Sequence, residues 1–260
     1  VSDKTVTPPE LQQFYAEKLL FLKPAFFVSG HRGNHMNVIH GRPPPRSQLG
    51  FSATDFVFCC FNTLYKIDKE IFRVWMDVMT RVPNSILWLL SEPAEAHAHL
   101  CREAAKSNVT CDRIRFTDKT PLEDHIQVKS NCDLHLDTPR YNAHGTTSDI
   151  IWAGVPTLTL ARETMAARVG SSLMLANDYP VLVARNLEDY LQLAVRLATQ
   201  PTVLLPIREH IKSVRLTMQL FNVRDFIKEL EVGLHLLWEV HRAKAGQTMH
   251  VIATPTINQI

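Results

Sequence analysis

The turn from Tyr141 to Asp149, which reads YNAHGTTSD, is the best candidate for chemistry in the chain. A predicted strand leads into it and a predicted helix leaves it. Gly145 lets a backbone come close to a ligand, and the N–H groups of Gly145, Thr146 and Thr147 at a helix start would point at an anion. The alternative is a plain capping box, because Thr146 and Asp149 have its spacing.

A lysine, Lys66, ends the loop that follows another predicted strand. A cation at this place could neutralise a phosphate. Taken alone, a solvated surface lysine is the simpler interpretation. Because both segments follow strands, Lys66 and the turn at Thr146 can converge at one edge of a parallel sheet.

The histidines carry weaker signals. His125 lies in a predicted helix beside two acidic residues, where a surface or half-buried histidine is the usual interpretation. His31, His35 and His40 lie in a loop rich in Gly and Pro, with no Cys or close carboxylate to complete a metal site. We therefore expect these three side chains to be solvated.

Several phosphate-binding and catalytic patterns are absent from the sequence. It contains no G-x-G-x-x-G, no G-x-x-x-x-G-K-[ST], no G-x-S-x-G and no D-x-D. A phosphate would therefore be held by Lys66, by backbone N–H groups and by a helix N-terminus, and no metal-bridged diphosphate is suggested.

Strands and helices alternate along the middle of the chain. Apolar residues between Ile71 and Val82 recur on one helix face, and the predicted strands are short apolar runs. We expect strands over 56–61, 86–90, 114–116, 134–136 and 157–160. We expect helices over 71–82, 93–106, 121–130, 146–153 and 164–175. The alternation predicts an α/β fold with a Rossmann-like parallel sheet and helices on both faces.

Ligands of such sheets bind beyond the carboxyl ends of the strands, near the point where the strand order reverses. The loops selected by this rule are 62–66, 118–121 and 137–147. The flanking segments follow other patterns. We expect a helix over 9–22, a strand over 26–28, a loop or linker over 30–50, helices from 187, over 202–215 and over 223–244, and a frayed tail from 246.

Composition excludes several classes of protein. The 260 residues are 45% hydrophobic and 21% charged, as in ordinary globular proteins, and no apolar run approaches the length of a membrane span. A net charge of +2 does not indicate a protein that binds nucleic acids through a broad basic surface. The five cysteines include no C-x-x-C, so we expect neither a disulfide scaffold nor structural zinc and favour a reducing compartment. The polar start does not resemble a signal peptide, and the initial Val1 fits a processed product or a fragment.

Ordered blocks of the sequence resemble the eukaryotic protein O-GlcNAc transferases. The resemblance covers roughly residues 5–245. The blocks that carry it are Phe61–Asp68, Arg81–Ser85, Trp88–Leu90, Leu136–Pro139, Asn142–Pro156 and Glu163–Val169.

The resemblance implies the GT-B arrangement of two Rossmann-like lobes. Residues 1–50 would then hold the end of the N-terminal catalytic lobe and a linker, and residues 51–245 the C-terminal lobe that binds the nucleotide sugar. The later helices would form a helical C-terminal extension, and residues 246–260 a tail. Most of the N-terminal catalytic lobe and the family's tetratricopeptide repeats are missing from the sequence.

The implied activity is transfer of N-acetylglucosamine from UDP-GlcNAc to Ser or Thr hydroxyls of proteins in the cytoplasm or nucleus. The transfer inverts the anomeric centre and uses no metal or other cofactor. The implied partners are the donor, a protein acceptor and the missing lobe, with no nucleic acid and no membrane. Because the departing UDP gains negative charge, a lysine and preorganised N–H donors are the catalytic parts needed, and losing one such donor typically costs about 3 kcal/mol.

Carried over by position, Lys66 would be the catalytic residue that contacts the diphosphate and stabilises the departing UDP. His144, Gly145 and Thr146 would cradle the phosphates, and Asp149 would bind the ribose hydroxyls. The whole implied nucleotide-sugar site comprises Thr63, Lys66, Thr120, Leu122, His125, Val128, His144, Gly145, Thr146, Thr147 and Asp149.

The base contacts depart from the family pattern more than the phosphate contacts do. His125 and the backbone near Thr120 would face the uracil. Thr63 stands where the animal enzymes have Gln, Leu122 replaces a base-contacting Lys, and Val128 replaces an Arg. Two alternatives stay open: a non-catalytic nucleotide-sugar-binding module, and an O-fucosyltransferase that uses GDP-fucose, as SPINDLY-type relatives do. The histidine-containing turn and its aspartate favour the N-acetylglucosamine branch.

Overall fold

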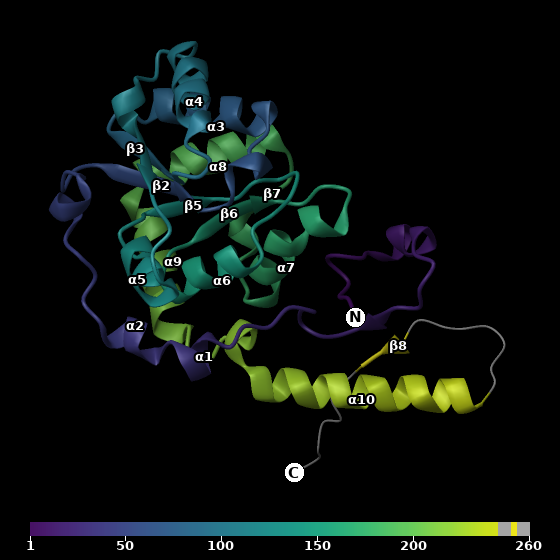
Figure 1. Cartoon of the computed structure of the whole chain (residues 1–260). Coiled ribbons are helices and arrows are strands. Elements are labelled where there is room, and N and C mark those ends of the chain that lie inside the picture. The colour runs from purple at the N-terminus through teal and green to yellow at the C-terminus, as the bar shows by residue number, and fades with distance from the viewer. Residues whose placement is uncertain (244–250, 254–260) are drawn as a thin grey trace.

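The structure is a computed structural model that describes residues 1–243 and 251–253 (Figure 1). Within these residues the main sheet has six strands, all parallel, in the order β4-β3-β2-β5-β6-β7. The strands are β2 Phe56–Cys60, β3 Ser85–Leu90, β4 Ile114–Thr117, β5 Leu134–Leu136, β6 Thr157–Leu160 and β7 Val183–Ala184. The predicted parallel sheet is confirmed, and β7 adds a strand too short to show a period in the sequence.

Helices cover both faces of the sheet (Figure 1). α3, α4 and α8 lie on one face, and α5, α6 and α7 lie on the other. The helices are α3 Lys69–Arg81, α4 Glu95–Ala105, α5 Leu122–Lys129, α6 Gly145–Trp152, α7 Val169–Ala176, α8 Leu187–Thr199 and α9 Pro201–Val214. The expected helix over 164–175 is divided, because a separate 3-10 turn, η5 Met165–Ala167, precedes α7.

Local signals explain where the longer helices begin. The Asp68 carboxylate accepts a hydrogen bond from the Ile71 N–H at 2.9 Å at the start of α3, and Asn186 caps α8 in the same way. Each cap satisfies an N–H that has no partner within the helix. The remaining 3-10 turns of this region are η3 Leu64–Lys66, η4 Cys111–Arg113, η6 Pro180–Leu182 and η7 Gln219–Phe221.

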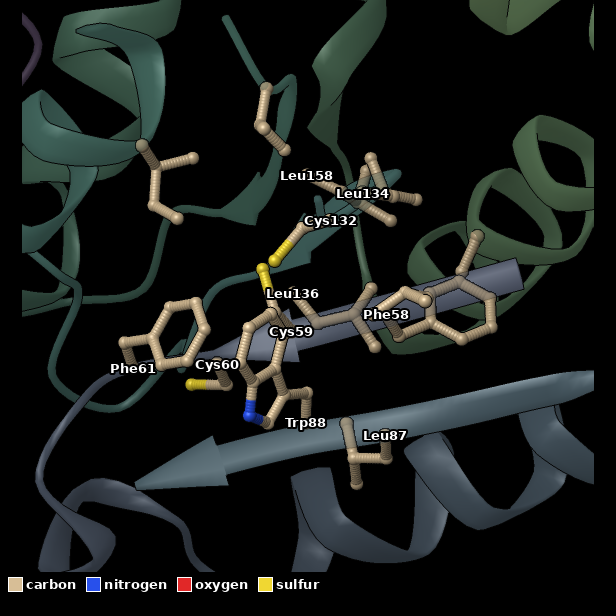
Figure 2. Packing of buried hydrophobic residues seen from close by; sticks show 14 of the residues in the cluster. Phe58, Cys59, Cys60, Phe61, Leu87, Trp88, Cys132, Leu134, Leu136 and Leu158 are labelled. Carbon is tan, nitrogen blue, oxygen red and sulfur yellow. The ribbon is translucent and has the colours of Figure 1, made fainter. Parts of the chain in front are cut away.

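The hydrophobic core lies between the sheet and both helix layers. Phe58, Cys59 and Cys60 of β2 are 0% exposed, because a parallel strand covered on both faces by helices buries successive side chains. In Figure 2 the sulfur atoms of Cys59 and Cys132 point toward each other among these apolar side chains. Burial is the main reason that the pKa of the Cys59 thiol is raised.

The strand order reverses between β2 and β5. β3 and β4 extend the sheet on one side of β2, whereas the chain then returns to place β5 on the other side. The segments that follow β2 and β5 therefore flank the reversal at the carboxyl edge. This is where ligands bind in open α/β sheets.

The first 30 residues differ from the expected pattern. Only Pro9–Phe14 of the expected helix over 9–22 is helical, as the 3-10 turn η1, and Leu20–Phe21 forms strand β1. The expected strand over 26–28 is irregular. β1 pairs in parallel with β8, Val251–Ile252. The apolar residues that suggested a helix face therefore form a strand that pairs with a segment distant in the sequence.

The carboxyl-terminal helix α10, Val223–Arg242, packs against this small two-stranded sheet. The second apolar cluster of the fold comprises Leu20, Leu22, Val251 and Ala253, with Phe226, Leu230, Leu237 and Val240 against it. Residues 251–253 are thus ordered by pairing, although they fall in the expected tail. Residues 246–250 and 254–260 of that tail lie outside the described residues.

The Gly- and Pro-rich segment 30–50 contains structure that its composition did not predict. It forms α1 His31–Asn34, α2 Met36–His40 and the 3-10 turn η2 Arg46–Leu49. α2 packs against α5, and the Trp152 Nε1–H of α6 donates to the carbonyl oxygen of His35 at 2.9 Å. The segment is therefore docked along the α5 and α6 side of the sheet.

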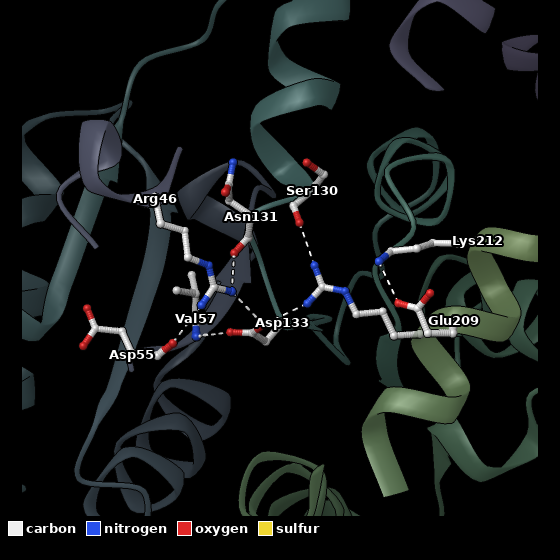
Figure 3. Close-up of polar contacts among 9 residues, drawn as sticks. Arg46, Asp55, Val57, Ser130, Asn131, Asp133, Glu209 and Lys212 are labelled. Carbon is white, nitrogen blue, oxygen red and sulfur yellow. Dashed lines mark hydrogen bonds and ion pairs between the residues drawn. The ribbon is translucent and has the colours of Figure 1, made fainter. Parts of the chain in front are cut away.

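Asp133 ties this segment and α9 to the amino-terminal edge of the sheet (Figure 3). One carboxylate oxygen accepts from Arg46 at 2.7 Å and from Arg208 at 2.8 Å, and the other accepts from the N–H of Val57 at 2.8 Å. The Asp133 side chain is 15% exposed, so these charge-assisted bonds act where water screens them poorly.

One disulfide corrects the expectation from the cysteine pattern. Cys101 of α4 and Cys111 at the start of η4 are bonded, with their Cα atoms 4.9 Å apart. The tight turn between them includes Asn108 at a positive φ of 58°, which folds the chain back on itself. Cys59, Cys60 and Cys132 are free and buried.

Among the described residues, every helix falls short of what a bilayer crossing requires in length or in apolar character.

Replacing Asp133 with Ala should lower the free energy of unfolding by about 2–4 kcal/mol, because two arginines lose their shared partner. Urea denaturation followed by circular dichroism measures this change. Glu209→Ala is the matched control, since Glu209 is 67% exposed and pairs with Lys212 on the same helix as Arg208. Equal losses for the two variants would contradict the role given to Asp133.

Candidate functional site

Lys66 and the loop after β5 meet at the reversal of the strand order. Lys66 ends η3, in the loop that follows β2, and its Nζ donates a hydrogen bond to the carbonyl oxygen of Asn142 at 3.1 Å. The ammonium has three N–H donors, so this contact fixes its position and leaves donors for a ligand. Asn142 is three residues before Gly145, where α6 begins. The hydrogen bond therefore places the Lys66 ammonium beside the loop that leads into this helix.

The buried carboxylate of Asp137, the residue after β5, shapes this loop. It is 0% exposed. One oxygen accepts from the N–H groups of Thr138 at 2.9 Å and Ala143 at 2.7 Å, and the other accepts from the Thr159 hydroxyl at 2.8 Å. Burial raises the pKa of Asp137 to about 6, against the lowering effect of these donors and of the Lys66 cation.

Three hydrogen bonds fix Asn142 and therefore also fix its carbonyl oxygen, which accepts the hydrogen bond from Lys66 Nζ. Its N–H donates to Ala166 O at 2.9 Å, and its side-chain amide donates to Thr138 O at 3.0 Å. Its side-chain oxygen accepts from the N–H of Gly170 at 3.0 Å. A Cβ at Gly170 would lie 2.4 Å from Asp137 Oδ2, so only glycine allows this close approach.

The start of α6 is open rather than capped. His144 precedes the helix without a side-chain cap, and the Thr147 hydroxyl donates back to Ala143 O at 2.9 Å. The capping-box alternative is not formed, because the Asp149 carboxylate is engaged elsewhere. In the part of the chain that the structure describes, the N–H groups of Gly145, Thr146 and Thr147 have no acceptor, whereas the Ser148 N–H donates to His144 O at 3.2 Å. A Cβ at Gly145 would meet nothing within 4 Å, so space for a ligand remains.

The electrostatic state of Lys66 follows from its half-buried position. Burial lowers the pKa of Lys66, whereas the charges of Asp137 and Cys60 raise it. The imidazole of His144 lies nearby, and burial lowers the pKa of His144, with the Lys66 charge adding to the lowering. His144 Nε2 is 3.3 Å from the carbonyl oxygen of Ala166.

Asp149 forms a buried network that local sequence did not reveal. Its Oδ1 lies 2.8 Å from His31 Nε2, and its Oδ2 accepts from Lys129 Nζ at 2.7 Å. Lys129 is 1% exposed, and His31 is also hydrogen-bonded to the Ser29 hydroxyl. Burial acts to raise the pKa of Asp149, but the bond to His31 and the charge of Lys129 outweigh it and leave the pKa lowered.

The expectation that the three loop histidines are solvated is wrong for His31, which is 8% exposed, and incomplete for His35. His35 Nδ1 lies 3.4 Å from the Glu123 carboxylate of α5, whereas His40 is exposed. A signal for Lys129 was present, since it shares a helix face with the fully buried Ile126. A lysine on an apolar face needs an internal anion.

The residues expected around a base lie along α5. The His125 ring is 5.3 Å from the Phe61 ring, and burial together with the Lys129 charge lowers the pKa of His125 to about 4. Leu122 is 47% exposed.

The other residues expected around the base and the loop differ in their burial. Thr120 is exposed, whereas Val128 packs against the core. Within residues 1–243, no hydrogen bond or ion pair joins Thr120, Leu122 or Val128 to Lys66. Thr63 directly precedes η3, and its carbonyl accepts from the Lys66 N–H at 3.0 Å.

A cleft of about 830 Å³ lies away from these residues, between segment 23–27, the end of α7 and α10. None of the residues expected to bind a nucleotide sugar lines it. Among residues 1–243 and 251–253, no three His, Cys, Asp or Glu side chains are grouped to hold a metal ion. Metal independence stays a prediction.

A doubly wound parallel sheet with a lysine and an uncapped helix start at its reversal defines a Rossmann-like lobe of the kind used by two-lobed glycosyltransferases. The sequence model described as glycosyl transferase family 41 matches residues 44–230. The chain therefore belongs to glycosyl transferase family 41.

Named relatives agree with this assignment. The Arabidopsis thaliana protein named "Probable UDP-N-acetylglucosamine--peptide N-acetylglucosaminyltransferase SEC" is 38% identical over 243 residues, which cover 93% of this chain and 25% of the relative. The Caenorhabditis elegans UDP-N-acetylglucosamine–peptide N-acetylglucosaminyltransferase is 34% identical over 211 residues, or 81% of this chain and 18% of the relative. The chain thus spans about a quarter or less of these relatives' lengths.

A solved structure shares the fold over nearly the whole chain. A lysine-to-methionine mutant of the Thermobaculum terrenum O-GlcNAc transferase matches with a TM-score of 0.76 and 26% identity, covering 94% of this chain and 45% of that protein. The lipopolysaccharide glycosyltransferase WaaG, at 14% identity and a TM-score of 0.56, shares the fold alone.

The raised pKa of Asp137 predicts a pH dependence of stability. The folded chain binds more protons than the unfolded chain between the ordinary pKa of 3.8 and about 6, so stability falls as pH rises through that window. We expect a contribution on the order of 1–3 kcal/mol, measured by urea denaturation from pH 4 to about pH 7. Asp137→Asn should flatten this slope and the exposed control Glu10→Gln should keep it. An unchanged slope in Asp137→Asn would refute the assignment.

Proposed function

We propose that this chain is the donor-binding lobe of a protein O-GlcNAc transferase, which transfers N-acetylglucosamine from UDP-GlcNAc to Ser or Thr hydroxyls of proteins. The observation that carries the proposal is the meeting of Lys66 with the uncapped start of α6. A cationic amine beside a loop that leads into several unpaired N–H groups is suited to a diphosphate.

Family membership supports the choice of donor and acceptor. The relatives' names specify UDP-N-acetylglucosamine and a peptide. Identity is 38% with the SEC protein and 28% with the Arabidopsis SPINDLY protein, so the chain is more similar to the former. Both relatives are named for UDP-N-acetylglucosamine, which supports UDP-GlcNAc as the donor ahead of the alternative, GDP-fucose.

In the proposed reaction, the acceptor hydroxyl oxygen attacks the anomeric carbon from the face opposite the diphosphate, and its proton passes to a general base in the acceptor-binding part of the enzyme. The bond from that carbon to the β-phosphate oxygen breaks, and its electron pair leaves with UDP. Lys66 and the N–H groups of Gly145, Thr146 and Thr147 face the charge that develops there. Such preorganised donors act more strongly in the transition state than in the ground state.

The nucleoside end is assigned to α5 and α6. Asp149 keeps lone pairs beyond those used by His31 and Lys129, and a carboxylate can accept further hydrogen bonds from ribose hydroxyls. His125, with a pKa of about 4, is neutral at pH 7, so its ring can face a base as a hydrogen-bonding group rather than a cation.

The rest of the enzyme is part of the proposal. The chain spans about a quarter or less of the curated relatives named above, so we expect the acceptor site and the remaining catalytic lobe to come from other segments of the full protein. If the full protein lacks them, the second candidate is a nucleotide-sugar-binding module without turnover. We propose a cytoplasmic or nuclear location, because three of the five cysteines are buried free thiols, although the Cys101–Cys111 disulfide is a feature more common in oxidising compartments.

Lys66→Ala should weaken UDP binding by about 10- to 100-fold, because a charge-assisted bond to the diphosphate is lost. Isothermal titration calorimetry of the chain with UDP measures the effect. Lys69→Ala is the control, since Lys69 is an exposed lysine three residues further on. Unchanged UDP affinity in Lys66→Ala would refute the role of the amine.

The donor assignment predicts that UDP and UDP-GlcNAc bind more tightly than GDP and GDP-fucose. It also predicts that saturating EDTA leaves UDP affinity unchanged. Both comparisons use the same calorimetric titration. Preference for GDP would support the fucosyltransferase alternative, and loss of binding in EDTA would contradict metal independence.

A third experiment measures peptide glycosylation by the longest gene product. Its result separates an enzyme from a binding module.

A further inference from the structure

An aromatic ring covers the Lys66 ammonium. Lys66 Nζ lies 3.7 Å from the centroid of the Tyr141 ring, while the same atom donates to Asn142 O at 3.1 Å. The ring of Tyr141 is part of an exposed turn, and the residue is 38% exposed. A cation this close to a ring face is attracted by the ring's quadrupole, most strongly where water is partly excluded.

We propose that Tyr141 is a positioning residue for the donor site, whose ring face holds the Lys66 amine against the loop after β5 and keeps it charged. The inference rests on the proposed function for its meaning in catalysis. The contact between the ring and the ammonium does not require a bound nucleotide sugar.

The turn that carries the ring is fixed from behind. The Thr138 hydroxyl donates to the carbonyl oxygen of Tyr141 at 2.7 Å, and the following residue, Asn142, is held by the bonds already described. On its other side the Tyr141 ring lies 5.4 Å from the His144 ring, at an angle of 55°. The backbone that carries the ring is therefore fixed, and the ring lies against both the Lys66 ammonium and the His144 imidazole.

The charges around Lys66 set the direction of the effect. Asp137 at the end of β5 and Cys60 of β2 favour the ammonium, and burial opposes it. His144 is the other titratable group facing the amine, and its pKa is lowered, so at neutral pH it adds little positive charge. The ring of Tyr141 acts in the same direction as Asp137. Removing the ring should therefore lower the pKa of Lys66 further.

The first experiment titrates the Lys66 amine directly in the chain without donor. Lysines labelled with carbon-13 at Cε are followed by NMR from pH 7 to about pH 12, and the Lys66 signal is assigned by its loss in Lys66→Arg. We expect Tyr141→Leu to lower the Lys66 pKa by about 0.5–1 unit, from the strength of a partly desolvated cation–π contact. Tyr141→Phe, which returns a ring without the hydroxyl, should restore the original value.

Tyr65→Leu is the matched control. Tyr65 is the neighbour of Lys66 and is 72% exposed, and in the described part of the chain its ring has no recorded cation contact. Its removal should leave the Lys66 titration where it was. A cooperative thermal transition close to that of the parent shows that each variant is folded, and Tyr141→Met serves as a second ringless variant.

The second experiment measures UDP affinity by calorimetry between pH 7 and about pH 10. Tyr141→Leu should bind UDP about threefold to tenfold more weakly, and its loss of affinity at alkaline pH should begin at a lower pH than in the parent. A purely structural role for the ring would lower affinity equally at every pH.

The two measurements separate the inference from the proposed function. If the parent chain does not bind UDP but the Lys66 pKa falls in Tyr141→Leu, the proposed donor fails and the positioning role stands. If the Lys66 pKa is the same in the parent, Tyr141→Leu and Tyr141→Met, the inference is overturned whatever the chain binds. Failure of Tyr141→Phe to restore the value would also overturn it, because the hydroxyl and not the ring would be responsible.

Discussion

The buried carboxylate of Asp137 is the constraint on which the site depends. A carboxylate at 0% exposure persists only if donors surround it, and here two backbone N–H groups and the Thr159 hydroxyl supply them. Those same bonds pull the loop after β5 into the one shape that brings Asn142 O to Lys66. The absence of a side chain at Gly170 is part of this arrangement, because α7 must approach within contact of the carboxylate.

The neighbourhood of β2 and β5 could be predicted from sequence. Alternating apolar runs and helix faces indicated a parallel sheet, and the rule for strand reversal selected the loops that hold Lys66 and Gly145. These signals are local in sequence or follow from general topology. They were enough to predict that Lys66 lies beside the loop that leads into α6.

Features that depend on distant partners could not be predicted in this way. β1 pairs with β8, which lies more than two hundred residues later in the chain. The residues of β1 fit a helical pattern in the sequence, and only the folded structure shows that Leu20 lies beside Val251. The ring contact of Tyr141 depends on two loops that meet only in the folded sheet. The Cys101–Cys111 bond depends on a turn whose geometry the cysteine count does not encode.

The pairing of Asp149 explains how an acidic side chain is tolerated beside the proposed anion site. Asp149 lies on α6, the helix whose start would receive a diphosphate, and an unpaired carboxylate there would repel that ligand. Lys129 and His31 supply hydrogen bonds that hold Asp149 and a cation that balances its charge, at 1% and 8% exposure respectively. Because His31 comes from the segment before the sheet and Lys129 from α5, the electrostatics of the α6 start depend on three separate parts of the chain. The docked Gly- and Pro-rich segment therefore contributes to the proposed site through His31 and is more than a connection to it.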